Sequence, residues 1–322
     1  MDKIVSKLLS SDEPAVRYKV LVNVLGHDPE SDEAQRLRQE IQESPRARTL
    51  RAQVDPPSDM PPGPYRKWTG AHWVLTDLAD LGYPPGDERL LPLRQQIYDW
   101  LFGEKHQASI QTIDGRVRRC ASQEGNALYY LLALGLADGG TEELARRLVR
   151  WQWPDGGWNC DKNPAARHSS FMESLIPLRG LALHARLTGN LDSRKAAARA
   201  AEIFLKRHLY RRQSDGSVID QEFILLHYPC YWHYDILFGL KVLAEAGFIG
   251  DPRCSQALDL LEAKRLPDGG FPAEKRYYRV SDKPVSGRSL VDWGGASKRR
   301  MNEWVTVDAL TALRAAGRPV EA

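Results

Sequence analysis

Pro154-Asp155-Gly156-Gly157-Trp158 lies between two stretches with helical periodicity, and Pro267-Asp268-Gly269-Gly270-Phe271 repeats the same pattern later in the chain. Weaker copies, Asp114-Gly115 and Asp215-Gly216, occupy similar breaks between predicted helices. A turn segment that recurs between amphipathic helices at intervals of roughly 40 to 60 residues is typical of stacked helical hairpins with loops of variable length. The sequence therefore predicts a repeat protein built from helix pairs.

The composition restricts the class of protein. The chain has 322 residues, of which 42% are hydrophobic and 27% charged, as in ordinary globular proteins. The net charge of +3 gives no reason to expect a nucleic-acid partner. Neither a membrane span nor a secretory leader is recognisable, and the four cysteines are too few for a disulfide framework, so we expect a cytoplasmic protein.

Two kinds of helix alternate along the chain. One kind is apolar on most of its faces, and several of its members end at a glycine, as a C-terminal cap requires. The other kind carries more charge and has a single apolar face. The apolar helices are expected at 68–81, 120–136, 168–187, 231–246 and 301–316, and the charged ones at 32–52, 88–102, 141–150, 193–208 and 252–264.

This alternation predicts an all-α fold in which the apolar helices form an inner layer. Five outer–inner pairs, with a sixth from the N-terminal helices, suffice to close a ring, so we expect an (α/α)6-type toroid. Residues 1–52 are expected to form a short N-terminal helical extension, either as the first hairpin or as a HEAT-like cap, and residues 53–322 the toroid domain. An open HEAT-type solenoid is the alternative, but it would not need a Gly/Pro-rich connection as long as residues 271–295.

The two Asp-Gly-Gly-Trp/Phe segments and the helix start Cys120-Ala-Ser-Gln-Glu-Gly-Asn-Ala-Leu resemble the α/α toroid of squalene–hopene (terpenoid) cyclases and protein prenyltransferase β subunits. The resemblance covers the chain from about Pro64 onward. It implies a central cavity and terpenoid-cyclase-like or prenyltransferase-like chemistry. The sequence departs from the family in two ways: it has no Asp-x-Asp-Asp acid motif, and it lacks the Asp, Cys and His pattern with which the prenyltransferases hold zinc.

Basic residues gather just before the starts of the apolar helices. A helix N-terminus carries partial positive charge, so a cation there is disfavoured by about 0.3–1 kcal/mol. The unfavourable placement suggests an anion site, at which backbone N–H groups and guanidinium groups hold a phosphate, diphosphate or carboxylate. The alternative is that these charges are solvated or paired with carboxylates. The candidates are Arg118, Arg119, Arg167, Arg299 and Arg300.

Cys120, Cys160 and His168 lie at or before the starts of neighbouring apolar helices. Three such ligands leave a fourth position for water or substrate, as in catalytic zinc sites. We therefore expect these residues to bind Zn²⁺, with Asp161 and His233 as further possible ligands. The alternative is that the cysteines are small buried apolar residues.

Acid and aromatic side chains complete the predicted cavity. The candidates for proton transfer are Glu124, His233, Glu303 and Asp235, although an acid in the first turn of a helix can also serve only as a cap. The residues expected to contact the apolar body of a ligand are Trp68, His72, Tyr231, Trp232 and Trp304.

Together these features predict an enzyme that binds an anionic, amphiphilic small molecule of the isoprenoid diphosphate kind, with zinc as a candidate cofactor. Two alternatives remain open. One is a carbohydrate-active hydrolase or lyase that uses paired acids. The other is a scaffold that displays the basic residues to a partner. The sequence leaves the substrate, the reaction and the oligomeric state undetermined.

Overall fold

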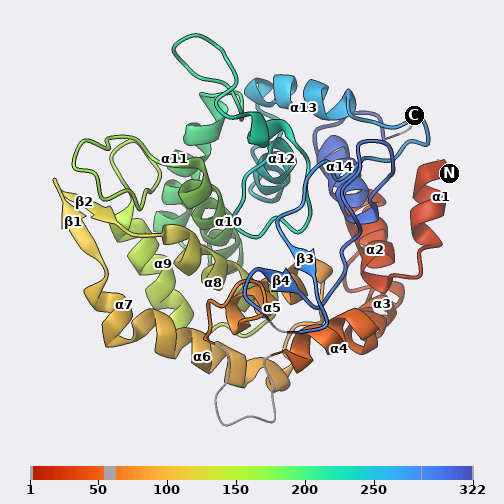
Figure 1. The fold of residues 1–322 in the computed structure, drawn as a ribbon, viewed down its shortest axis with the longest axis horizontal. Helices are drawn as coiled ribbons and strands as arrows, with labels where there is room; N and C mark the ends of the chain where they lie inside the picture. The colour runs from red at the N-terminus through yellow and green to blue at the C-terminus, as the bar shows by residue number, and fades with distance from the viewer. Residues whose placement is uncertain (1–2, 54–62, 284, 321–322) are drawn as a thin grey trace. The chain divides into compact units, whose positions relative to one another are not determined.

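The computed structural model describes residues 3–53, 63–283 and 285–320, which form a mostly helical chain with two very small sheets (Figure 1). The prediction of a mostly helical fold is therefore confirmed for these residues. Most of the Pro-rich segment that follows the predicted boundary at residue 52 lies outside the described residues. Backbone contacts divide the chain into two compact units.

Unit 1 consists of Met1–Glu88, Leu225–Tyr231 and Leu258–Ala322. The N-terminal helices belong to it, because α2 contacts α3, α5 and the C-terminal α14. Its elements are α1 (Lys3–Leu9), α2 (Pro14–Lys19), the π-helical turn Val20–Val24, α3 (Asp32–Glu43), α4 (Pro45–Ala52), α5 (Ala71–Leu81), the strand pair β3 (Arg279–Val280) and β4 (Arg288–Ser289), and α14 (Glu303–Ala315).

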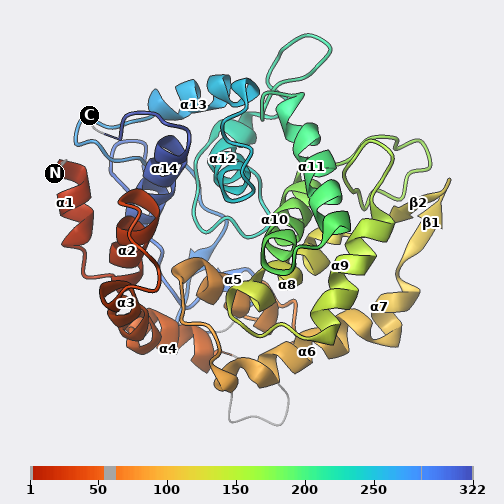
Figure 2. The same cartoon turned by 180° about the vertical axis from the view of Figure 1, so that it is seen from behind.

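Unit 2 consists of Arg89–Ile224 and Trp232–Ala257. Its central helix is α10, which packs against α8 on one side and α11 on the other, as both ribbon views show (Figures 1 and 2). Its elements are α6 (Leu91–Phe102), α7 (Glu104–Ala108), the hairpin of β1 (Gln111–Ile113) and β2 (Arg116–Arg118), α8 (Ala121–Ala133), α9 (Gly139–Trp151), α10 (Phe171–Thr188), α11 (Leu191–Leu205) and α12 (Ile236–Glu245). The short α13 (Ser255–Glu262) is divided between the two units.

The predicted difference between the two kinds of helix is present. In α12 every residue from Ile236 to Leu243 is buried, and α5 and α14 are buried on nearly all faces. By contrast, α3 buries only Ala34, Leu37 and Ile41, at the spacing of a single apolar face. The helices predicted to be apolar therefore form the interior of their units.

Capping residues explain several helix boundaries. Gly82 and Gly189 end α5 and α10 in the left-handed conformation, with φ of 78° and 73°. The helix predicted from Tyr231 begins instead at Ile236, because the Asp235 carboxylate accepts a hydrogen bond from the Phe238 N–H at 2.7 Å and caps it.

One predicted copy of the repeat segment has a different local structure. Asp114 and Gly115 do lie between two helices, α7 and α8, but they join β1 to β2, with φ of 48° and 68°, and so form a hairpin turn and not a turn of the Asp-Gly-Gly kind. An Asp-Gly pair suits a two-residue turn in which both residues have positive φ, so the dipeptide alone does not distinguish the two structures.

The two complete Asp-Gly-Gly segments have the same hydrogen bonds. The Trp153 N–H donates to the Gly157 carbonyl at 2.8 Å, and the Leu266 N–H donates to the Gly270 carbonyl at the same distance. The aromatic residue that follows then donates its N–H to a hydroxyl in the first turn of the next apolar helix. Trp158 bonds Ser174 Oγ at 3.1 Å, and Phe271 bonds Thr306 Oγ1 at 2.9 Å. The predicted repeat is thus confirmed at these two positions, one in each unit.

Glycine allows α8 and α10 to approach closely. A Cβ atom at Gly125 would lie 2.6 Å from the backbone N of Pro177, and one at Gly180 would lie 2.6 Å from the Gly125 carbonyl oxygen. Pro177 has no N–H, so its backbone can face α8 without an unpaired donor. This contact fixes the positions of the two helix starts, which carry the candidate site.

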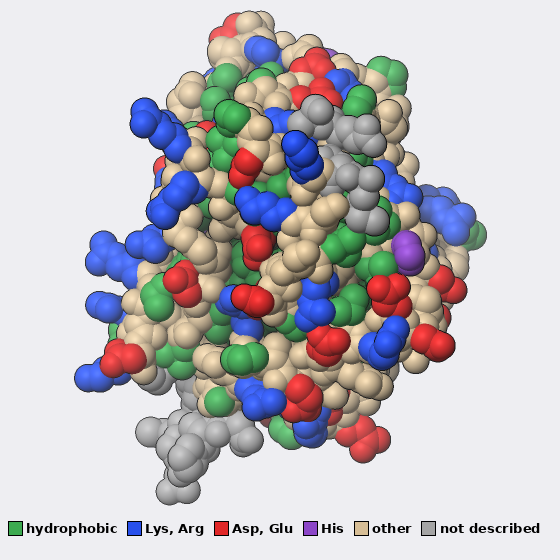
Figure 3. All heavy atoms as spheres, turned by 90° about the vertical axis from the view of Figure 1, so that its right-hand side faces the viewer, with side chains coloured by type: hydrophobic (Ala, Val, Ile, Leu, Met, Phe, Trp, Pro, Cys, Tyr) green, Lys and Arg blue, Asp and Glu red, His purple; other side chains and the backbone are tan. Residues whose placement is uncertain are grey.

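Charged side chains of both signs are mixed on the face of the molecule drawn in Figure 3. This agrees with the small net charge of +3. In the described part of the chain, none of the helices has the length and apolar character needed to span a bilayer.

Candidate metal centre

Two thiols and a carboxylate meet at the starts of α8 and α10. The ligand atoms of Cys120, Cys160 and Glu173 all lie within 4.8 Å of one another, and the three residues are half-buried. Cys120 immediately precedes α8, Cys160 follows the first Asp-Gly-Gly segment, and Glu173 lies in the first turn of α10. Zinc accepts both thiolate and carboxylate ligands, so this donor set fits the metal.

Backbone contacts hold the three residues together. An isolated parallel bridge between Arg118 and Asn159 aligns the segments that lead to the two cysteines. The Ser122 N–H at the start of α8 donates to Glu173 Oε2 at 2.9 Å, and Cys160 Sγ lies 3.5 Å from Glu173 Oε1. The carboxylate therefore bridges the two helix starts.

The two thiols of the cluster differ in how readily they ionise. A hydrogen bond from the Cys120 thiol lowers the pKa of Cys160, so Cys160 is the thiol that ionises more readily. The same contact, together with burial, raises the pKa of Cys120. Burial raises the pKa of Glu173, although the Ser122 N–H opposes the shift.

The second repeat segment provides an internal comparison. Counted from the shared hydrogen bonds, Cys160 corresponds to Ala273 and Glu173 to Val305. Both of these residues are buried and apolar. The segment can therefore fold without polar residues at these two positions. This favours a functional role for Cys160 and Glu173 in unit 2.

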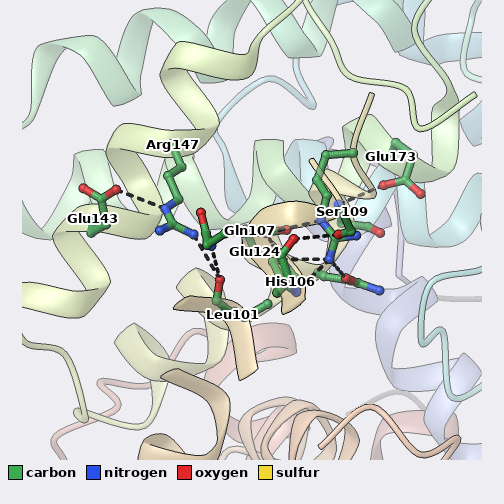
Figure 4. A network of polar contacts seen from close by, with 11 residues as sticks. Leu101, His106, Gln107, Ser109, Glu124, Glu143, Arg147 and Glu173 are labelled. Carbon is green, nitrogen blue, oxygen red and sulfur yellow. Dashed lines mark hydrogen bonds and ion pairs between the residues drawn. The ribbon is translucent and has the colours of Figure 1, made fainter. Parts of the chain in front are cut away.

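A buried polar network adjoins the cysteines (Figure 4). His106 Nε2 lies 2.7 Å from Glu124 Oε1. Arg119 Nη2 lies 2.8 Å from His106 Nε2 and 3.0 Å from Nδ1. Glu124 is fully buried, and its Oε2 has no hydrogen-bond partner among the described residues. Arg119 acts electrostatically on Cys120, and Glu124 on Glu173, which joins the network to the cluster.

The other residues predicted in unit 2 lie apart from the cluster. His168 is exposed and does not belong to the cluster. The third group beside the two cysteines is Glu173, five residues further along, in the first turn of α10. Arg118 is buried over the Trp153 ring and donates to the Ala166 carbonyl, while Arg167 is exposed and pairs with Asp114 at 2.9 Å.

His233 stacks on Trp232 with ring centroids 4.0 Å apart. Asp235 is the N-cap of α12, as described above.

The remaining predicted residues belong to unit 1. Trp68 and Tyr231 stack with ring centroids 3.9 Å apart. Burial lowers the pKa of His72 to about 3, so its ring is neutral at pH 7. Glu303, Arg300 and Trp304 line a pocket of about 310 Å³, and Arg299 is exposed next to Arg300.

Unit 1 also contains a buried ionic cluster that sequence reasoning missed. Lys19 Nζ lies 2.9 Å from Asp80 Oδ2 and 3.3 Å from Asp308 Oδ1, and the Tyr228 hydroxyl donates to Asp80 at 2.8 Å. Burial, with the nearby charge of Asp80, holds the pKa of Asp77 well above its usual range. The signal for this cluster was the presence of Asp77, Asp80 and Asp308 inside otherwise apolar helices.

The raised pKa of Asp77 predicts a pH-dependent stability. Above the pKa of the unfolded chain, folding must take up a proton at Asp77 or bury its charge, so this residue lowers stability as pH rises. We expect Asp77→Asn to raise the melting temperature at pH 7 and to have little effect at pH 3, where Asp77 is protonated in both states. Thermal unfolding of both proteins from pH 3 to pH 7 measures this, and a variant that is less stable at pH 7 would contradict it.

No protein-family model matches this sequence, and a search of curated proteins finds no match either.

Proposed function

We propose that this chain is an (α/α)6-type toroid enzyme, similar to terpenoid cyclases and protein prenyltransferase β subunits, that acts on an anionic amphiphilic small molecule with the help of a metal ion. The repeated Asp-Gly-Gly segments and the two kinds of helix support the fold assignment. All four cysteines are present as thiols and not as disulfides, which supports a reducing, cytoplasmic environment.

The observation that carries the proposal is the convergence of Cys120, Cys160 and Glu173 within 4.8 Å. These residues would hold zinc and leave a coordination position open. Bound there, zinc would act as a Lewis acid that activates a thiol, hydroxyl or water.

The neighbouring residues have roles that follow from their contacts. Arg119 would hold the anionic end of the ligand, because its guanidinium acts on the cluster from the start of α8. Glu124 would accept or hold a proton at Oε2, which has no partner among the described residues. His106 positions Glu124 through the bond at Oε1.

Elemental analysis of protein purified without chelator or affinity tag tests the metal. We expect near one zinc ion per chain in the wild type, loss of the ion in Cys160→Ser, and weaker binding in Glu173→Gln. His168→Ala and Cys254→Ser are the matched controls and should keep the metal, since neither residue belongs to the cluster. If the wild type holds no metal, or if Cys160→Ser retains it, the zinc centre is wrong.

The ligand class is tested by thermal unfolding. An isoprenoid diphosphate should raise the melting temperature of the wild type more than that of Arg119→Gln. A scaffold protein would respond neither to this ligand nor to sugars.

A carbohydrate hydrolase or lyase is the second candidate, favoured by one observation. Burial raises the pKa of Asp77, whereas the neighbouring Asp80 faces the Lys19 ammonium, and such contrasting environments are typical of acid and base pairs. Tyr231 and Trp304 lie in the same unit. This function predicts a higher melting temperature with oligosaccharides or uronic acids, and loss of that response in Asp77→Asn.

A further inference from the structure

The end of α11 forms a strongly basic pocket of about 610 Å³ in unit 2. Its lining includes five basic residues from a single short stretch of chain. They are Lys206, Arg207, His208, Arg211 and Arg212. None of them belongs to the candidate metal centre or to the sites predicted from the sequence.

The backbone brings these residues together by an unusual turn. His208 and Leu209 follow the helix with φ of 45° and 69°, a left-handed conformation that residues other than glycine rarely adopt. Leu209 is fully buried, and its carbonyl accepts a hydrogen bond from the Tyr234 hydroxyl at 2.7 Å. The chain then reverses in a short hairpin, in which the Arg212 N–H donates to the Ser217 carbonyl at 2.8 Å. Arg211 and Arg212 are thereby returned to the end of the helix that carries Lys206 and Arg207.

In the described residues, the side chains of the three arginines of the pocket donate hydrogen bonds to backbone carbonyls. Arg207 donates to Ile203 at 3.0 Å, Arg211 to Gly216 at 2.8 Å, and Arg212 to Ile219 at 3.1 Å. In the described chain no carboxylate forms an ion pair with any of the three. Each guanidinium therefore has a fixed position and keeps further N–H groups for a ligand.

Two acids near the pocket offset only part of its charge. Glu202 is held by the two terminal nitrogens of Arg253, at 3.0 and 2.8 Å, and its contact with Lys206 is longer, at 3.7 Å. Asp215 accepts hydrogen bonds from Ser217 within the hairpin and also interacts electrostatically with Arg212. The pocket thus has an excess of positive charge in a protein with a net charge of only +3.

We propose that this pocket binds a small molecule carrying a diphosphate or two phosphate groups. Arginine forks bind phosphate oxygens with paired hydrogen bonds, and several positive charges match a ligand with several negative ones better than a single carboxylate. A volume of about 610 Å³ is in the range of small-molecule sites. The basic residues occupy one turn and one hairpin, which favours a compact ligand over a nucleic-acid strand.

Calorimetric titration with inorganic pyrophosphate in metal-free buffer tests this site. We expect the double variant Arg211→Gln, Arg212→Gln to bind about tenfold more weakly or worse. Higher salt should also weaken wild-type binding. Arg194→Gln is the matched control, because Arg194 is an exposed arginine at the other end of α11. It should bind as the wild type does.

Cys160→Ser, which alters the candidate metal centre, should bind pyrophosphate as the wild type does. This outcome would show that pyrophosphate binding does not depend on the metal centre. Absence of binding to the wild type, or equal binding by the double variant, would overturn the proposal. Tighter binding of a single-stranded oligonucleotide than of pyrophosphate would overturn the small-molecule assignment.

Discussion

Replacing Lys19 with Met is expected to lower the free energy of unfolding by about 3–5 kcal/mol at pH 7. Lys19 is only 4% exposed and is the cation that faces Asp80 and Asp308. Its removal would leave two carboxylates in the interior of unit 1 without this positive charge, and an uncompensated buried charge is much more costly than a lost surface ion pair. Lys19 also lies over the rings of Tyr228 and Trp304, so the variant loses two favourable cation–aromatic contacts.

Chemical denaturation of the wild type and the variant measures this effect. Lys7→Met is the matched control, because Lys7 pairs with Asp268 on the surface, where an ion pair contributes only about 0–1 kcal/mol. If Lys19→Met is no less stable than Lys7→Met, the buried cluster does not depend on its lysine.

The second large effect is expected at the contact between α8 and α10. Gly125→Ala places a methyl group 2.6 Å from the backbone of Pro177, and backbone atoms cannot move aside as the end of a side chain can. We expect the overpacking to lower the free energy of unfolding by about 1–3 kcal/mol or more. The two helix starts would also separate, so the proposed binding of zinc by Cys120 and Glu173 should weaken in the same variant.

Gly139→Ala is the control for this substitution. A Cβ atom at Gly139, in the first turn of α9, would meet no atom within 4 Å. This variant should keep its metal affinity and be at least as stable as the wild type, because alanine has the higher helix propensity. Equal stability of the Gly125 and Gly139 variants would show that the close approach of the helices is not required.

Local signals in the sequence predicted the helices well. Periodicity, capping glycines and the Asp-Gly-Gly segments depend on neighbouring residues, so they can be read without knowledge of the fold. The predictions were less exact where one or two residues decide the local structure. Asp235 delays the start of α12, and Asp114-Gly115 forms a β-hairpin within the predicted break between α7 and α8.

The candidate site was predicted only in part. The two cysteines were identified because they lie at or before the starts of neighbouring apolar helices, and the structure brings them together. The third group depends on the course of residues 159–168, which the sequence does not give, so His168 was predicted and Glu173 was missed. The acids around Lys19 were missed for a related reason: their partners are distant in sequence, as with Lys19 and Asp308.

The two Asp-Gly-Gly segments differ in chemistry while sharing their hydrogen bonds. Backbone groups and one hydroxyl hold each segment. The turn therefore does not need polar side chains at the positions of Cys160 and Glu173, which Ala273 and Val305 occupy in the other copy. A module of this kind can be duplicated and then altered, because a reactive pair can be gained or lost at these positions while the turn persists. The hydrogen bonds that form the turn are therefore independent of the side chains that could carry chemistry. A chain built from such turns can change the side chains of one hairpin without altering the fold of the others.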